Sequence, residues 1–155
     1  MDLRLGFSGF RQGCRTFLRC KADLPSRALN QEFNTLNIRH DKNIVIVTCG
    51  GQHSTLNDWV MLVDELDRLG CPSVIDARSA SGDLTEIDAY LLALHTDERR
   101  QLRSHRIAIV MSGGLRNYLG FFMVSAKNVG LQIESFECFD TATAWAASNR
   151  EQQAE

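Results

Sequence analysis

The chain has 155 residues, of which 44% are hydrophobic and 23% charged, and its formal net charge is −2. This length suits one domain that buries a continuous core without help from metals or disulfides. No apolar run approaches the roughly 20 residues that a bilayer-spanning helix needs. The composition therefore predicts a soluble protein with no transmembrane segment.

Charge is divided unevenly along the chain. Residues 1–31 contain six lysines or arginines and two acidic residues, a net charge of +4, whereas residues 32–155 contain 11 basic and 17 acidic residues, a net charge of −6. Binding to nucleic-acid phosphates needs a net basic surface. The acidic main part therefore argues against a nucleic-acid partner.

The basic extension, residues 1–31, lacks a regular hydrophobic period and is expected to be loosely ordered. An additional strand or helix packed on the domain, or a targeting segment, is the alternative. The five cysteines form no C-x-x-C pair and no metal-ligand spacing with the four histidines. An odd number of cysteines without such a framework fits a reducing compartment, so we predict a cytoplasmic protein.

After this extension the sequence alternates between strand-like and helix-like segments. Two apolar runs, 36–39 and 43–49, are joined by "HDK" and predict a β-hairpin. A helix follows, which begins at a capping box of Thr55 with Asp58 and ends at Gly70. Its predicted inward-facing residues are Leu56, Trp59, Val60, Val63 and Leu66.

Three further strands are predicted at 73–77, 106–111 and 131–136. The second of these, "RIAIVM", is apolar after its first residue, which is typical of a strand covered on both faces. The stretch 97–106 contains both acidic and basic residues, which predicts a solvent-exposed connector. The alternative interpretation is that its arginines bind an acidic partner.

Each of these three strands is followed by a predicted helix. The first is expected to face the sheet with Leu84, Ile87, Leu91 and Leu94. The second, after "SGG", is expected to face it with Leu119, Phe122, Ala126 and Val129. The third covers 139–148, with Asp140 as its N-cap.

This order of elements predicts a single α/β domain over residues 32–148, followed by a polar tail at 149–155. Alternation of strands and helices implies right-handed crossovers and a mostly parallel sheet. We expect about five strands and about four helices, with the opening hairpin adding one antiparallel pair.

Four features of the segment 33–148 occur together: the hairpin, the strands "VIDAR" and "RIAIV", and the ending "FDTATAWAAS". In this order they resemble the STAS domains, named for sulphate transporters and anti-sigma factor antagonists, and especially the SpoIIAA-like branch. The ending is similar to the F-x-x-x-x-x-A-x-x-W close of that branch, here Phe136 or Phe139 with Ala142 and Trp145. The resemblance implies a SpoIIAA-like fold.

In anti-sigma factor antagonists, the loop after the corresponding strand carries a D-S-S-G or D-S-T-G motif whose serine a partner kinase phosphorylates. Aligned on Asp76, this motif falls on residues 84–87, so the resemblance implies Thr85 as the modifiable hydroxyl. The aspartate and glycine of the motif are missing, and Glu86 adds a charge that opposes a phosphate. The alternative is that Thr85 or Asp83 merely caps the helix.

Loops that follow parallel strands are where we expect partner or ligand contacts. The loop 112–120 has neither the P-loop nor the G-x-G-x-x-G spacing of nucleotide-binding loops. The two remaining interpretations are a structural turn and a site where Arg116 contacts an anion. His53 beside Ser54 has no orienting carboxylate, which favours a turn over catalysis, and Asp76 is expected to accept hydrogen bonds from a neighbouring loop. The candidate contact residues are Ser81, Asp83, Thr85, Glu86, Arg116 and Tyr118.

The sequence shows no spacing typical of a Cys–His catalytic pair, a set of metal ligands, a phosphate-binding loop or a pair of catalytic carboxylates. We therefore predict no catalytic residue, metal or cofactor. With the resemblance, this indicates a non-enzymatic regulatory domain that binds a protein partner, or a small apolar or anionic ligand. One alternative is a SEC14-like lipid or small-molecule carrier. Another is an enzyme that uses Asp76, His53 or Arg116. The run 121–123 includes at least one large apolar residue that cannot face the sheet, a candidate for homodimer contact.

Overall fold

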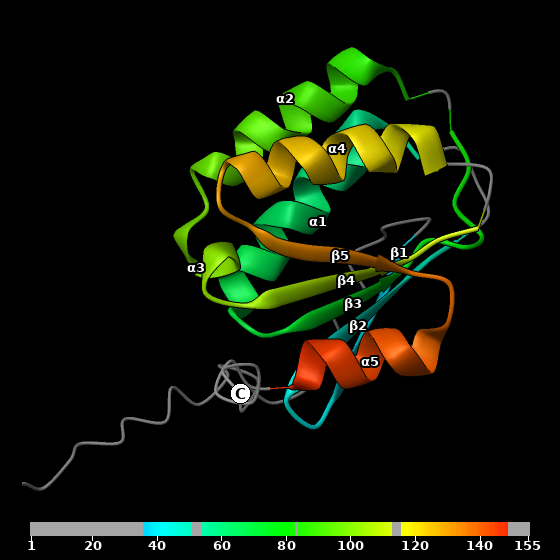
Figure 1. Cartoon of the computed structure of the whole chain (residues 1–155), viewed down its shortest axis with the longest axis vertical. Helices are drawn as coiled ribbons and strands as arrows, with labels where there is room; N and C mark the ends of the chain where they lie inside the picture. The colour runs from blue at the N-terminus through cyan, green and yellow to red at the C-terminus, as the bar shows by residue number, and fades with distance from the viewer. Residues whose placement is uncertain (1–35, 51–53, 83, 113–115, 149–155) are drawn as a thin grey trace, which may run out of the picture.

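The computed structural model describes residues 36–50, 54–82, 84–112 and 116–148. Within them the elements follow the order β1 (Leu36–Asp41), β2 (Ile44–Cys49), α1 (Leu56–Leu69), β3 (Ser73–Asp76), α2 (Glu86–Asp97), α3 (Arg100–Arg103), β4 (Arg106–Val110), α4 (Arg116–Asn128), β5 (Gln132–Phe136) and α5 (Phe139–Ala147) (Figure 1). The short helix α3 lies where the sequence predicts only a connector. The predicted extension and tail lie outside the described residues. No helix in the described part of the chain has the length and apolarity to span a membrane.

The five strands form one sheet in the order β1-β2-β3-β4-β5. β1 pairs antiparallel with β2, so that Leu36 lies opposite Cys49, and the turn between them holds Lys42 at a φ of 54°. The pairs β2–β3, β3–β4 and β4–β5 are parallel. The predicted α/β domain, a mostly parallel sheet with an N-terminal antiparallel hairpin, is confirmed.

Three crossover helices share one face of this sheet. Each parallel connection advances by one strand in the same direction, so right-handed crossovers place α1, α2 and α4 on a single side. Adjacent strands are only about 4.8 Å apart, whereas packed helix axes need about 8–10 Å. Three helices side by side would need about 16–20 Å, whereas the four parallel strands that they connect span only about 14 Å. The middle helix, α2, packs against α4 and α1 on the outside (Figure 1).

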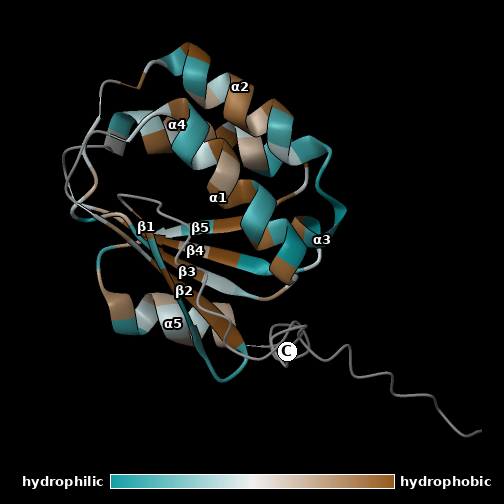
Figure 2. Cartoon of the chain, turned by 180° about the vertical axis from the view of Figure 1, so that it is seen from behind, coloured by the Kyte–Doolittle hydropathy of each residue, from teal (hydrophilic) through white to brown (hydrophobic). Residues whose placement is uncertain are grey.

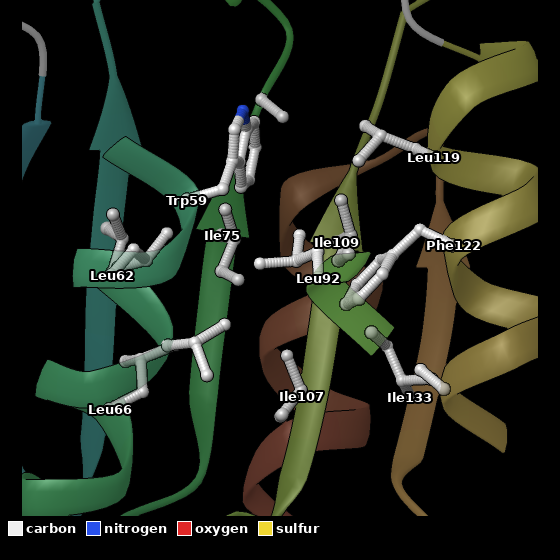
Figure 3. Packing of buried hydrophobic residues seen from close by; sticks show 14 of the residues in the cluster. Trp59, Leu62, Leu66, Ile75, Leu92, Ile107, Ile109, Leu119, Phe122 and Ile133 are labelled. Carbon is white, nitrogen blue, oxygen red and sulfur yellow. The ribbon is translucent and has the colours of Figure 1, made fainter. Parts of the chain in front are cut away.

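The main core lies between the sheet and these three helices (Figure 3). The strands contribute alternate residues, which include Val45, Val47, Ile75, Ile107, Ile109 and Ile133. The helices contribute Trp59, Leu62 and Leu66 from α1, Leu92 from α2, and Leu119 and Phe122 from α4. The predicted inward faces of α1 and α4 are confirmed, because all of their residues are buried or half-buried.

The opposite face of the sheet is covered by α5. Its small residues Ala142 and Ala146 pack in a cluster that includes Ala108 of β4, which lets the helix approach the strands closely. The buried Arg106 lies with its guanidinium carbon 5.1 Å from the ring centroid of Trp145, and its Nη1 donates to the Trp145 carbonyl at 3.0 Å. This cation–π contact and hydrogen bond hold the C-terminal end of α5 against the sheet.

The predicted inward face of α2 is wrong. The sequence predicts that Ile87, Leu91 and Leu94 face the sheet, but they are 70%, 46% and 44% exposed. The buried residues are instead Ala89, Leu92, Ala93 and Thr96. The helix is apolar on both sides, so its periodicity allows two orientations. The small side that contains the alanines faces inward, where close packing against neighbouring helices is required.

Leu92 and Leu91 provide a matched test of which side of α2 is buried. Leu92 is fully buried, so Leu92→Ala is expected to lower the free energy of unfolding by about 2–5 kcal/mol. Leu91→Ala, on the exposed side, should change it by about 1 kcal/mol or less. Urea denaturation followed by circular dichroism measures both values, and equal losses would contradict the assigned orientation.

Candidate functional site

The parallel strands β2 to β5 end at one edge of the sheet, so the segments that follow them lie together (Figure 1). The register places Thr48 beside Asp76, Asp76 beside Val110, and Val110 beside Phe136. α/β proteins commonly bind ligands at such an edge, in the crevice where the strand order reverses. The order of the described strands never reverses. Contacts at this edge must therefore come from the loops and the helix starts themselves.

The loop between β3 and α2 is held by two neighbouring loops. The backbone N–H and the hydroxyl of Ser54 both donate to the Ser81 carbonyl, at 2.8 and 2.9 Å. The hydroxyl of Ser112 donates to the Arg78 carbonyl at 2.9 Å. A Cβ atom on Gly82 would lie 2.5 Å from the Ser54 carbonyl oxygen, so a side chain there would displace the backbone. These contacts give the loop a defined shape.

Thr85 is the N-cap of α2 and forms a capping box with Asp88. The Thr85 hydroxyl accepts from the Asp88 N–H at 3.2 Å and donates to the Asp88 carboxylate at 2.8 Å. That carboxylate also accepts from the Thr85 N–H at 2.8 Å, and this bond lowers the pKa of Asp88. The predicted cap is confirmed. Phosphorylation of Thr85 stays a prediction; it would remove the cap and add charge beside Asp88 and Glu86.

Two other predicted contact residues, Ser81 and Glu86, are exposed. Ser81 lies in the fixed loop, and Glu86 is the first residue of α2. Asp83 and the side chain of Arg116 lie outside the described residues, as does His53 of the candidate catalytic loop. The start of α2 is therefore the part of the predicted site whose geometry is defined.

Tyr118 is placed differently from the other predicted contact residues. Its side chain is only 7% exposed, and its hydroxyl has no hydrogen-bond partner among the described residues. Burial, together with the nearby charge of Asp88, raises the pKa of Tyr118. The ring belongs to the main core, so Tyr118 supports the start of α4 from inside and does not offer a surface to a partner.

Asp76, at the end of β3, is engaged by Arg78. Its Oδ1 accepts from the Arg78 N–H at 3.2 Å and from Nε at 2.9 Å, and its Oδ2 accepts from Nη2 at 2.7 Å. These bonds lower the pKa of Asp76. Their stabilising effect is present above the unfolded pKa of about 3.9 and is lost as the pH falls through the folded value. Asp76 is an acceptor as predicted, but its donor is Arg78 in the segment that directly follows β3, not a neighbouring loop.

Two free cysteines near this edge lie in opposite environments. Cys49 is buried at the end of β2, where burial and the charge of Asp76 raise the pKa of its thiol to about 12. Cys138 is exposed and occupies the N-cap position of α5, where the sequence predicts Asp140. Asp140 lies in the first turn instead. The backbone N–H groups of Thr141 and Asp140 lower the pKa of Cys138, so it is the more reactive thiol.

The outer side of α2 exposes large apolar residues at i, i+3, i+4 and i+7, which share one side of a helix. We name this set the α2 stripe: Ile87, Tyr90, Leu91 and Leu94, which are 70%, 51%, 46% and 44% exposed. Figure 2 shows α2 at the outside of the molecule with hydrophobic residues along its length. Sequence reasoning missed this surface. The signal that could have found it is the apolarity of the helix on both sides.

The C-terminal end of α2 is tied to α1 by an ionic cluster. His95 Nε2 lies 2.7 Å from Asp64 Oδ1, and Arg99 Nε donates to the same oxygen at 2.7 Å. Burial alone raises the pKa of Asp64, but the bonds from His95 and Arg99 outweigh this effect and lower the pKa. With the capping box at its start, α2 is held at both ends, so the α2 stripe belongs to a fixed helix.

The hollows that the described residues line include a small cavity and a larger groove. The cavity, within the main core, has a volume of about 20 Å³ and an apolar wall that includes Trp59, Leu92 and Phe122. It has room for little more than one water molecule. The groove lies beside α4 and the end of β5 and has a volume of about 400 Å³. Its lining consists of Met111, Gly120, Met123, Ser135, Phe136 and Glu137.

A scan against protein-family models gives no match, and neither does a search of curated proteins. Among solved structures, the chain is similar to an uncharacterised protein of the DUF3478 family with a SpoIIAA-like fold from Shewanella loihica PV-4. The two are 18% identical, with a TM-score of 0.46, and the match covers 72% of this chain and 92% of that chain. A similarity at this level concerns the arrangement of helices and strands, not activity.

Thr85→Ala tests the energetic role of the cap. Loss of the hydroxyl leaves the Asp88 N–H without its acceptor, so the free energy of unfolding should fall by about 1 kcal/mol. Thr85→Ser keeps the hydroxyl and serves as the matched control, with most of the stability retained. Urea denaturation of the three proteins gives the values. If alanine and serine behave alike, the capping box does not stabilise α2.

Cys138 and Cys49 are expected to differ in reactivity toward iodoacetamide. Because Cys138 is exposed and has a lowered pKa while Cys49 is buried with a raised one, Cys138 in the native protein should be alkylated at least about 100-fold faster. Peptide mass spectrometry over time measures both rates, and Cys138→Ser should abolish only the fast adduct of this pair. Comparable rates would show that one of the two environments is wrongly assigned.

Proposed function

We propose that this chain is a non-enzymatic regulatory domain that binds a protein partner through the outer side of α2. The observation that carries the proposal is the α2 stripe, a row of large apolar side chains opposite the buried side of a capped helix. A row of large apolar side chains along one side of a helix is normally covered by another element or by a partner. An exposed apolar surface of this kind marks a site of interaction.

Covering the α2 stripe supplies only part of the energy that such binding needs. Complete burial of a large apolar side chain contributes about 1.5–3 kcal/mol, and these four side chains are between 44% and 70% exposed. Together they would contribute roughly 5 kcal/mol before the cost of association. Micromolar affinity requires about 8 kcal/mol. The partner must therefore also contact polar residues around the stripe.

Polar residues of the predicted site lie at the N-terminal end of the stripe. Thr85 and Glu86 directly precede it, and the exposed Ser81 lies in the fixed loop before them. A polar margin around an apolar centre is the usual anatomy of a protein interface. The predicted contacts of Asp83 and Arg116 stay predictions from the sequence. A phosphate on Thr85 would remove the cap and add a charge of about −2 there, which makes it a means of regulation.

The alternative functions have less support. A lipid carrier encloses its ligand in an apolar cavity between helices and sheet, and the cavity there among the described residues, of about 20 Å³, is too small for one. The groove of about 400 Å³ has a suitable size for a small apolar ligand. This ligand is the second candidate, and native mass spectrometry of the purified protein would detect it. An enzyme based on Asp76 is disfavoured because Arg78 keeps that carboxylate ionised and weakly basic.

Leu91→Gln tests the proposed interface, because glutamine preserves helix propensity and removes apolar surface. Wild-type protein, used as bait, should retain a partner that Leu91→Gln binds at least tenfold more weakly, a loss of about 1.4 kcal/mol. Val124→Gln is the matched control, since this valine is 63% exposed on α4 outside the stripe, and it should bind like the wild type. Surface plasmon resonance with the isolated partner measures the three affinities. Equal affinities would rule out the stripe as the interface.

A further inference from the structure

We propose that the basic extension, residues 1–31, docks on the α2 stripe of its own chain and competes there with the protein partner. The docking depends on the stripe and on the charge and attachment of the extension. The competition rests on the function proposed above. Three properties favour this occupant: its apolar residues, its charge, and the point at which it joins the domain.

The extension carries the side chains that an apolar surface requires. It includes three of the eight phenylalanines of the chain. Its large apolar residues include Leu3, Leu5, Phe7, Phe10, Phe17 and Leu18. In Figure 2 the sheet and the other helices lie below α2, and the side chains of the α2 stripe are exposed, so a segment that arrives from elsewhere in the chain can reach them.

The charges of the extension and of the helices around the stripe are opposite. α1 has four carboxylates and one arginine, and α2 has three carboxylates and neither lysine nor arginine. α4, the other neighbour of α2, has one arginine, one lysine and no carboxylate, so the three helices sum to −4. Arg99 and Arg103 already pair with Asp64 and Asp97. Glu86, next to the stripe, has no ion-pair partner among the described residues. The extension, with its net charge of +4, is attracted to this end of α2.

The extension joins the domain at the edge where α2 begins. Leu36 pairs with Cys49, the last residue of β2, so the chain before β1 leaves from the carboxyl edge of the parallel strands. Ser54, just after β2, bonds to Ser81, just before α2. The 12 residues of α2 span about 18 Å, whereas 31 residues reach roughly 100 Å when extended. Such tethering gives an effective concentration of about millimolar, so a modest contact area suffices.

A second copy of the chain is a weaker candidate for this surface. Stable dimers bury about 800 Å² on each partner, whereas four partly covered side chains offer on the order of 300 Å². Pairing α2 with α2 would also bring together two helices that each carry three carboxylates and neither lysine nor arginine. A tethered basic segment meets neither obstacle.

Chymotrypsin cleaves after phenylalanine, so it reports directly on the apolar anchors of the extension. In the full-length protein, cleavage after Phe7, Phe10 and Phe17, mapped by mass spectrometry, should be at least tenfold slower than in the double variant Ile87→Gln/Leu91→Gln. Val124→Gln, the matched control on α4, should be cleaved as slowly as the wild type. Raising NaCl from about 0.05 M to about 0.5 M should speed cleavage of the wild type, because salt screens the attraction between the extension and α2.

Equal cleavage rates in the wild type and the double variant would overturn the proposal. A dimer seen by sedimentation velocity that the double variant abolishes would also overturn it, since the stripe would then belong to a second copy. Thermal melts verify that the variants, changed only at exposed positions, remain folded. If Leu91→Gln loses the partner while the double variant leaves cleavage unchanged, docking fails and the proposed function stands. If protection is lost but partner affinity is not, the proposed interface fails and docking stands.

Discussion

The structure depends on one geometric constraint: three crossover helices must share one face of a sheet whose strands are about 4.8 Å apart. α1 and α4 take the positions next to the strands, and α2 packs over them. The inner side of α2 places Ala89 and Ala93 beside Leu92, which lets the helix approach its neighbours closely. Both proposals for this chain follow from the outer position of α2, because that position turns a second apolar side of the helix toward solvent.

Although α2 lies at the periphery, it is firmly attached. Thr85 caps its first turn, His95 links its last turn to Asp64 of α1, and Ser54 fixes the loop that leads into it. An apolar surface on a fixed helix loses little conformational entropy when it is covered, which favours binding. The start of α2 therefore combines a rigid apolar surface with polar residues.

Much of the candidate site could be predicted because the interactions that form it are local. The cap at Thr85 needs only a carboxylate three residues later, and Asp76 is engaged by a residue two positions away. The burial of Tyr118 and the exposure of Leu91 could not be predicted in the same way. Each depends on which helix lies over the residue, and that contact joins segments that are far apart in the sequence.

The sequence by itself determined the order and type of the main elements, the antiparallel hairpin and the parallel strands, because hydrophobic period, caps and turn residues act over a few neighbouring positions. It also determined that a helix follows β3, with Thr85 or Asp83 as its cap. Only the tertiary structure decided which side of that helix is buried. Both sides of the helix satisfy the helical period: the exposed side with Ile87, Leu91 and Leu94, and the buried side with Ala89, Leu92 and Ala93. The crowding of three helices over one sheet face selected the smaller side for the interior and left the larger side exposed.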